Sequence, residues 1–159
     1  MVRVESNAGE VAAAVARYAD ALPKVLQGAA ELWTLQTEGE IKNASPSVHG
    51  EAGLRGAIHG EASKGSEGPD VTLVAAKDYA APVEFGSRPH EILPRNKMVL
   101  RFPGAGGGWQ FASSVQHPGT TAQPFFFSTI EAQLPDLGNL CAESLDELAR
   151  QSGLDGLGR

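Results

Sequence analysis

Apolar residues recur at spacings of mostly three and four positions along residues 8–44. Such spacing places them on one face of an α-helix, because a helix turns by about 100° per residue. The residues that share this spacing are Val11, Val15, Tyr18, Leu22, Leu26, Ala29, Leu32, Trp33 and Ile41. Pro23 has no N–H to donate to the carbonyl four positions back. The pattern therefore predicts two helical pieces, near 8–21 and 23–44, that kink or restart at Pro23.

A second helical pattern covers residues 124–151 near the end of the chain. Its apolar members are Phe125, Ile130, Leu134, Leu137, Leu140, Cys141, Leu145 and Leu148. Pro124 stands in the first turn, where helices tolerate proline, and Pro135 predicts a kink. At the start of the first helix, Asn7 is followed three residues later by Glu10, which predicts a capping box.

The segment between the helices, residues 45–117, has the features of loops and a small sheet. Residues 61–69 are rich in Gly, Ser and Glu and predict an exposed loop. Residues 70–76 carry β-branched side chains bounded by Pro and Lys-Asp, so they predict a strand. Two short β-type runs flank the glycine-rich residues 104–108 and predict a β-hairpin over 97–112 with an exposed, mobile tip.

Residues 79–85 are compatible with either a strand or a helical turn, since Ala80 favours a helix whereas Pro82 commits to neither. Gly86 marks the end of this element. The pattern as a whole predicts an α+β fold in a single domain, residues 1–159. It consists of N-terminal helices, a small and mainly antiparallel sheet with an extended hairpin, and a long C-terminal helix.

The composition restricts the class of protein. The 159 residues fit one domain, and the contents of 42% hydrophobic and 20% charged residues are typical of globular proteins. A net charge of −6, without a densely basic window, argues against a protein that grips nucleic acid by neutralising phosphates. Cys141 is the sole cysteine, which predicts a packed thiol and no intramolecular disulfide. The sequence has neither a signal-peptide pattern nor an apolar run of about 20 residues, so we expect no membrane contact.

Candidate catalytic residues are few. The histidines lack the spacing of a helical ligand pair or a zinc finger, so we expect hydrogen-bonded or solvated side chains and no metal. They are His49, His59, His90 and His117. Glu84 and Glu91 could serve as acid and base of a small hydrolase, but nothing in the sequence places them together. We expect one partly buried structural carboxylate, one solvated carboxylate, and no catalytic or cofactor-binding residue.

A strip of cations and aromatic side chains lies in and before the predicted hairpin. Its members are Arg88, Arg95, Lys97, Arg101, Phe102 and Trp109. Such a strip can touch nucleic acid, but in an acidic protein it more often binds an acidic neighbouring protein.

Residues 125–127 are three consecutive phenylalanines, and a helix cannot bury all three rings on one face. At least one ring is therefore expected to contact something outside its own core, either a loop or another subunit.

Two segments carry a resemblance to a known family. The first, residues 79–90, reads Tyr-Ala-x-x-Val-Glu-x-Gly, then Ser87 where threonine is usual, then Arg-Pro-His; the second, residues 117–126, runs from His-Pro-Gly to Pro-Phe. Upstream, Ala-x-Pro at 44–46 and Gly-Leu-Arg-x-x-Ile at 53–58 stand in the family's order. In these motifs the chain resembles the neck, or head–tail connector, proteins of long-tailed bacteriophages, which are also described as minor tail or tail-completion proteins.

The resemblance implies a non-enzymatic virion subunit, assembled in the host cytoplasm and located in the neck between the capsid portal complex and the tail. It implies a hexameric or dodecameric homo-oligomeric ring, with head-completion or adaptor proteins on one side and the tail terminator or tail tube on the other. DNA would pass through the lumen without sequence-specific binding. A tail terminator or tail-completion subunit is the alternative within the family, and a nucleic-acid-binding module or a small hydrolase is the alternative outside it. The motif residues assigned as candidate inter-subunit contacts are Tyr79, Val83, Glu84, Phe85, Gly86, Arg88, His90, Arg101, Trp109, His117, Pro118, Gly119, Pro124, Phe125 and Phe126.

Overall fold

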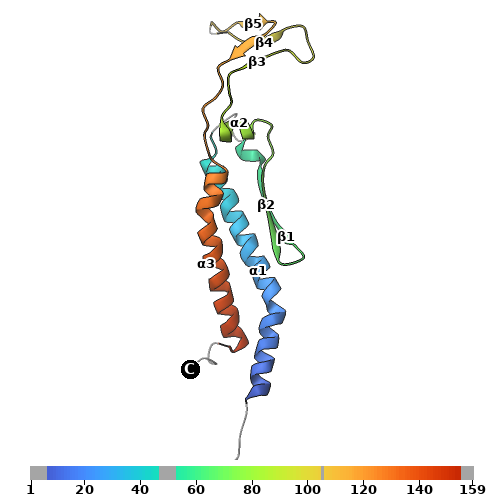
Figure 1. Cartoon of the computed structure of the whole chain (residues 1–159), viewed down its shortest axis with the longest axis vertical. Helices are drawn as coiled ribbons and strands as arrows, with labels where there is room; N and C mark the ends of the chain where they lie inside the picture. The colour runs from blue at the N-terminus through green and yellow to red at the C-terminus, as the bar shows by residue number, and fades with distance from the viewer. Residues whose placement is uncertain (1–6, 47–52, 105, 155–159) are drawn as a thin grey trace, which may run out of the picture. The chain divides into compact units, whose positions relative to one another are not determined.

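The computed structural model describes residues 7–46, 53–104 and 106–154 and shows an α+β protein (Figure 1). The elements in chain order are α1 (Ala8–Ala44), η1 (Arg55–Ala57), β1 (Ile58–Lys64), β2 (Pro69–Ala75), α2 (Ala80–Phe85), β3 (His90–Ile92), β4 (Leu100–Pro103), β5 (Trp109–Ala112), β6 (Val115–His117) and α3 (Phe127–Ser152). Within the described ranges the strands form three two-stranded antiparallel sheets, β1–β2, β3–β6 and β4–β5. His49, which was considered as a metal ligand, and Ala105 of the predicted hairpin tip lie outside the described residues.

The chain divides into two compact units. Unit 1 comprises Met1–Ala76 and Phe125–Arg159, and unit 2 comprises Lys77–Pro124. Unit 1 therefore contains the two long helices and the β1–β2 hairpin, whereas unit 2 contains α2 and the remaining strands.

Helix α1 runs without interruption over Ala8–Ala44, so the predicted division into pieces at Pro23 is wrong. Pro23 and Ala19 are both exposed, and the Ala19 carbonyl that loses its donor can therefore bind water. Asn7 is the N-cap residue as predicted, but its side chain makes no capping bond, and its carbonyl instead accepts the N–H of Glu10 at 3.0 Å. The predicted capping box is therefore wrong in its side-chain bonds.

Helix α3 begins at Phe127 and not at Pro124, so proline does not occupy its first turn. Pro135 lies inside the continuous helix at an exposed position, as Pro23 does in α1. The helix ends after Ser152, where Gly153 adopts φ 80° and its N–H donates to the Arg150 carbonyl. A left-handed glycine at this position is a common helix stop.

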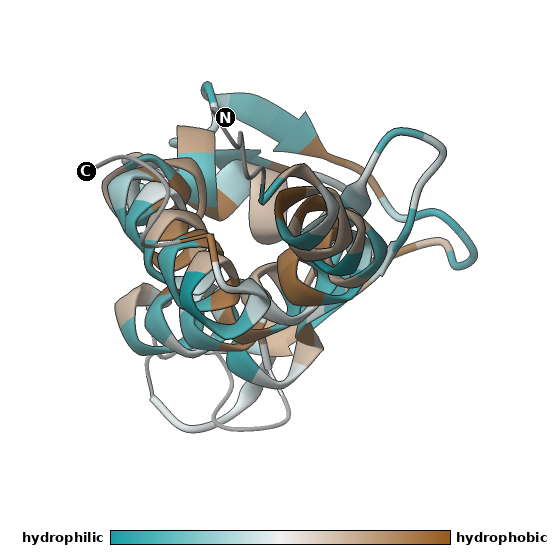
Figure 2. Cartoon of the chain, turned by 90° about the horizontal axis from the view of Figure 1, so that it is seen from below, coloured by the Kyte–Doolittle hydropathy of each residue, from teal (hydrophilic) through white to brown (hydrophobic). Residues whose placement is uncertain are grey.

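Helices α1 and α3 lie side by side in unit 1 (Figure 1). The indole Nε1 of Trp33 donates to the Gln133 carbonyl at 2.7 Å, and Nη2 of Arg17 donates to the Ser152 carbonyl at 2.8 Å. Seen from below, both helices carry hydrophilic residues on their outer sides (Figure 2). The buried apolar residues of unit 1 are Ala14, Ala29, Ala30, Trp33, Ile41, Leu54, Ala57, Ile58, Phe125 and Leu148.

The β1–β2 hairpin also packs on α1. The predicted strand at 70–76 is confirmed as β2, but the predicted loop at 61–69 is wrong, because Glu61–Lys64 completes β1 and pairs with β2. The close approach of β1 to α1 depends on Gly60: a Cβ there would lie 2.7 Å from Cγ2 of Thr34 and 2.9 Å from Cδ2 of Leu73. A larger residue at this position would have to displace these side chains. The other residues of β1 are mostly small or polar, so the strand does not resemble a typical strand in sequence.

In unit 2, residues 80–85 form helix α2, so of the two predicted alternatives for this segment the helical turn is confirmed and the strand is not. The predicted hairpin at 97–112 is confirmed, although its strands are short: β4 pairs with β5 from Leu100 opposite Ala112 to Pro103 opposite Trp109. The third pair, β3 with β6, was not predicted.

Candidate assembly interface

The two motif segments, which are separated by the hairpin in sequence, pair with each other in unit 2. Ser87 and Thr120 form an antiparallel bridge in which each N–H donates to the other's carbonyl, at 3.0 and 3.1 Å. Their hydroxyl oxygens are 3.0 Å apart. The N–H of Gln123 donates to the Val83 carbonyl at 2.8 Å. The segments singled out as the two halves of one signature therefore form one local structure.

Two glycines allow this pairing. Gly86 ends α2 with φ 75° and ψ 176°, and a Cβ there would lie 2.7 Å from the Thr120 carbonyl oxygen and 2.9 Å from the Ala122 nitrogen. Gly119 has φ 88°, and a Cβ there would overlap the Ser87 carbonyl oxygen. At both positions, any residue other than glycine would strain the backbone and overlap the opposite segment. Gly86 and Gly119 are thus required for the close approach of the two segments.

His90 and His117 are brought together by the same pairing. They are directly opposite each other in the β3–β6 ladder, with ring centroids 5.1 Å apart. Nδ1 of His90 lies 2.9 Å from the Arg88 carbonyl oxygen, so it carries the proton and donates. Nδ1 of His117 accepts the N–H of Gly119 at 3.0 Å. This histidine pair was not foreseen, because only the register of the two strands creates it.

The hydrogen bond to His117 bears on metal binding. Because Nδ1 of neutral His117 accepts a proton donor, the ring's own proton lies on Nε2, and neither nitrogen presents a free lone pair. Binding a metal through this ring would require the loss of the Gly119 bond. Among the described residues there is no group of three or more His, Cys, Asp or Glu that could hold a metal ion.

The two carboxylates considered for a hydrolase occupy different surroundings. Glu84 lies in α2 and is buried, with 5% of its surface exposed, whereas Glu91 lies in β3, opposite Gln116, and is exposed. Tyr79 is the N-cap residue of α2. The proline motif positions, Pro118 and Pro124, are exposed.

One face of the β4–β5 hairpin is aromatic and cationic. The register places Arg101 opposite Phe111 and Pro103 opposite Trp109, so these four side chains share a face. The guanidinium carbon of Arg101 lies 3.7 Å from the Trp109 ring centroid, within range of a cation–π interaction. We call these four residues the hairpin face. Phe111 was missed in the sequence because its partnership with Arg101 depends on where the hairpin turns.

Unit 2 exposes large apolar side chains and buries almost none. Its exposed members are Phe85, Ile92, Leu93, Met98, Val99, Trp109 and Phe111. Trp109 and Phe111 are 58% and 63% exposed, and Met98 is 93% exposed. Among the described residues of unit 2, Ala80 is the one buried apolar residue. Unit 2 is therefore ordered chiefly by backbone pairing and has no hydrophobic core of its own.

The charge of the chain is also divided between the units. Unit 2 has five Lys or Arg and three Asp or Glu, which give a formal charge of +2. The rest of the chain has eight Lys or Arg and sixteen Asp or Glu, which give −8. Arg88, Arg95, Lys97 and Arg101 are all exposed. The acidic protein thus presents a basic unit.

The phenylalanine triplet lies where unit 1 resumes. Phe125 is 1% exposed, Phe126 is half-buried and Phe127 is 53% exposed. Adjacent rings meet edge to face, with centroids 6.2 and 5.4 Å apart. Because α3 begins at Phe127, the three rings do not share one helix, and the expectation based on helical geometry does not apply to Phe125 and Phe126. The expected contact of one ring outside its own core stays a prediction.

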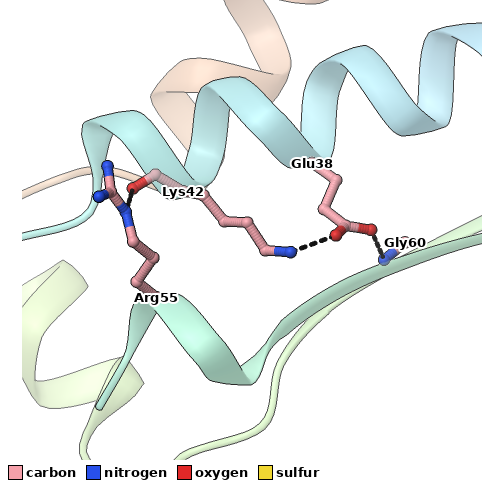
Figure 3. Close-up of polar contacts among 4 residues, drawn as sticks. All are labelled: Glu38, Lys42, Arg55 and Gly60. Carbon is pink, nitrogen blue, oxygen red and sulfur yellow. Dashed lines mark hydrogen bonds and ion pairs between the residues drawn. The ribbon is translucent and has the colours of Figure 1, made fainter. Parts of the chain in front are cut away.

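A further charged cluster lies at the C-terminal end of α1 (Figure 3). Glu38 bonds the Lys42 ammonium with one oxygen and accepts the Gly60 N–H with the other at 2.7 Å, while Nε of Arg55 donates to the Lys42 carbonyl at 2.9 Å. The bond from Lys42, followed by the bond from Gly60, lowers the pKa of Glu38 below its usual 4.5 despite partial burial. Every group is paired with a neighbour in a way that ties α1 to η1 and β1, so the cluster serves the fold.

Comparisons with protein-family models, with curated proteins and with solved structures found no match to this chain. Within the described ranges, neither long helix is apolar enough to cross a membrane.

Proposed function

We propose that the protein is a structural, non-enzymatic virion subunit that forms a ring in the neck of a long-tailed bacteriophage and joins the capsid portal complex to the tail. The ordered motifs of the sequence support this class. The pairing of the two halves of the signature, at Ser87 and Thr120, supports treating them as one functional element.

The observation that carries the proposal is the surface of unit 2. Exposed apolar patches on an ordered segment are typical of protein interaction sites, and interfaces are enriched in Trp, Phe, Met and Arg. Unit 2 exposes Trp109, Phe111 and Met98 together with Arg101. A subunit whose apolar surface is covered only in an assembly fits a ring that connects two preformed structures.

Ring formation needs two different patches on each subunit, because a head-to-tail contact joins unlike surfaces. The basic unit 2 and the acidic remainder of the chain provide surfaces of opposite charge. Opposite potentials favour correct docking and disfavour contacts between like surfaces.

The test is the oligomeric state of the purified chain by native mass spectrometry, with negative-stain electron microscopy of the same sample. We expect a closed ring of six or twelve copies. A monomer at every concentration would refute the ring. Lysates lacking the subunit should contain DNA-filled heads and free tails that join when the protein is added, whereas tails of irregular length would favour the tail-terminator alternative.

A second candidate, a nucleic-acid-binding module, is favoured by the cations around Trp109. One face of that ring is already covered by Arg101 at 3.7 Å, which leaves less surface for a stacked base. We expect no salt-sensitive shift of labelled DNA. A shift that weakens with salt and is lost in Arg101→Ala, without ring formation, would favour this candidate instead.

A further inference from the structure

Helix α1 has a side that neither α3 nor the β1–β2 hairpin covers. Trp33 bonds α3, and Glu38 bonds β1, so these neighbours occupy two sides of the helix. On the remaining side, helical geometry aligns Gly28, Leu32, Leu35 and Gly39. Glu31 lies beside them at the edge of the β1–β2 hairpin, because it is two turns before Glu38 and its partner Gln27 also donates to the Ala62 carbonyl at 3.3 Å. We call these five residues the leucine face.

The leucine face is apolar at its centre and open at its ends. Leu32 is 45% exposed and Leu35 is 68% exposed. A Cβ at Gly28 or Gly39 would meet nothing within 4 Å, so open space lies on either side of the two leucines. Glu31 is exposed and lies one turn before Leu35; its carboxylate accepts a bond from Nε2 of Gln27 at 3.0 Å and has further acceptor positions.

The hairpin face has the complementary properties. Its exposed aromatic residues, Trp109 and Phe111, offer apolar surface that can pack against the exposed leucines. Arg101 lies over the Trp109 ring, and the in-plane N–H groups of a stacked guanidinium can still bind a carboxylate with two hydrogen bonds. The basic charge of unit 2 and the acidic charge of unit 1 have the signs that such a contact requires.

We propose that the hairpin face of one copy docks on the leucine face of the next copy, with Arg101 bound to Glu31 and with Trp109 and Phe111 packed on Leu32 and Leu35. This inference rests on the proposed ring and names the contact that builds it. A second copy is the occupant because both complementary surfaces, apolar and oppositely charged, belong to the same chain. The exposed surface of α3 is a poorer match, since Leu137, one turn after the exposed Leu134, is itself half-buried.

The contact is tested by mixing two variants that each lack one surface. The hairpin variant carries Arg101→Glu and Phe111→Ser, and the helix variant carries Glu31→Lys and Leu35→Ser. Each is expected to weaken self-association by at least about 30-fold, as loss of a central interface residue does. Mixed together, they retain one intact contact per pair, so sedimentation should show a 1:1 dimer and no larger ring. Leu134→Ser, at a position 51% exposed on α3, is the matched control and should form wild-type rings.

A separate variant guards against misfolding. Arg101→Glu combined with Glu31→Lys in one chain reverses the proposed charge pair and should restore rings that either single change weakens. Wild-type rings from both surface variants, or a mixture that stays monomeric while the wild type forms rings, would overturn this contact and leave the proposed ring standing. A wild type that never associates would overturn the proposed function itself.

Discussion

Replacing Gly86 by alanine should loosen the pairing of the two motif segments. The φ of 75° and ψ of 176° at Gly86 fall in a region that is almost restricted to glycine, and a side chain there costs roughly 1–3 kcal/mol. The new Cβ would also meet the Thr120 carbonyl oxygen at 2.7 Å and the Ala122 nitrogen at 2.9 Å. These atoms belong to the backbone, so relief requires movement of the segment that bonds Ser87.

The effect can be measured by amide hydrogen exchange at Ser87 and Thr120, whose N–H groups form the bridge. A loss of 1–3 kcal/mol corresponds to a protection that falls about 5- to 150-fold, since a tenfold change is 1.4 kcal/mol. Gly108→Ala is the matched control, because a Cβ at Gly108 meets nothing within 4 Å. Amides in the centre of α1 should be unchanged in both variants. Protection at Ser87 and Thr120 that stays within a factor of two of wild type would refute the steric argument.

Two further changes test the packing of unit 1. Glu38→Gln should lower the unfolding free energy by about 1 kcal/mol at neutral pH, measured by chemical denaturation. Wild-type stability should fall as the pH drops below 4.5 through the lowered pKa of Glu38, and the variant should lack this loss. Glu147→Gln, at an exposed ion pair, should change the stability far less. Thr37→Val should raise the unfolding free energy by about 1 kcal/mol, because the fully buried Thr37 hydroxyl has no hydrogen-bond partner among the described residues. Thr34→Val should bring no such gain, since Oγ1 of Thr34 bonds the Ala30 carbonyl at 2.6 Å, and a less stable Thr37→Val protein would contradict the argument.

Helix positions could be predicted from the sequence where the pattern is local. The apolar spacing over residues 8–44 marks α1, and the glycine-rich residues 104–108 mark the turn between β4 and β5. The break at Pro23 was wrongly predicted because the sequence does not reveal that the Ala19 carbonyl, which loses its donor to the proline, is exposed to water. Strand β1 was missed because it is defined by its pairing with β2, whereas its residues from His59 to Lys64 are small or polar and lack the β-branched and aromatic side chains that identify strands.

The candidate site was only partly predictable for the same reason. The motif order marked both segments, and Gly86 could be recognised as a break. The sequence offers no signal for the pairing of His90 with His117, or of Arg101 with Phe111, because strand register decides which residues are opposite. The leucine face is likewise invisible in a helical pattern, since Leu32 fits the same apolar spacing as the buried Trp33 and Ile41.

The division between the two units explains why the paired motif segments depend on two glycines. A segment as short as Lys77–Pro124 can bury little apolar surface by itself, and it buries Ala80 alone among its described apolar residues. Its shape must then come from backbone hydrogen bonds, and the Ser87–Thr120 bridge requires the positive φ values of Gly86 and Gly119. Because this bridge pairs the two segments that lead into and out of the β3–β6 and β4–β5 strand pairs, the two glycines influence how Trp109 and Phe111 are presented. Losing either glycine should therefore impair assembly of the proposed ring even in a protein whose helical unit remains fully folded.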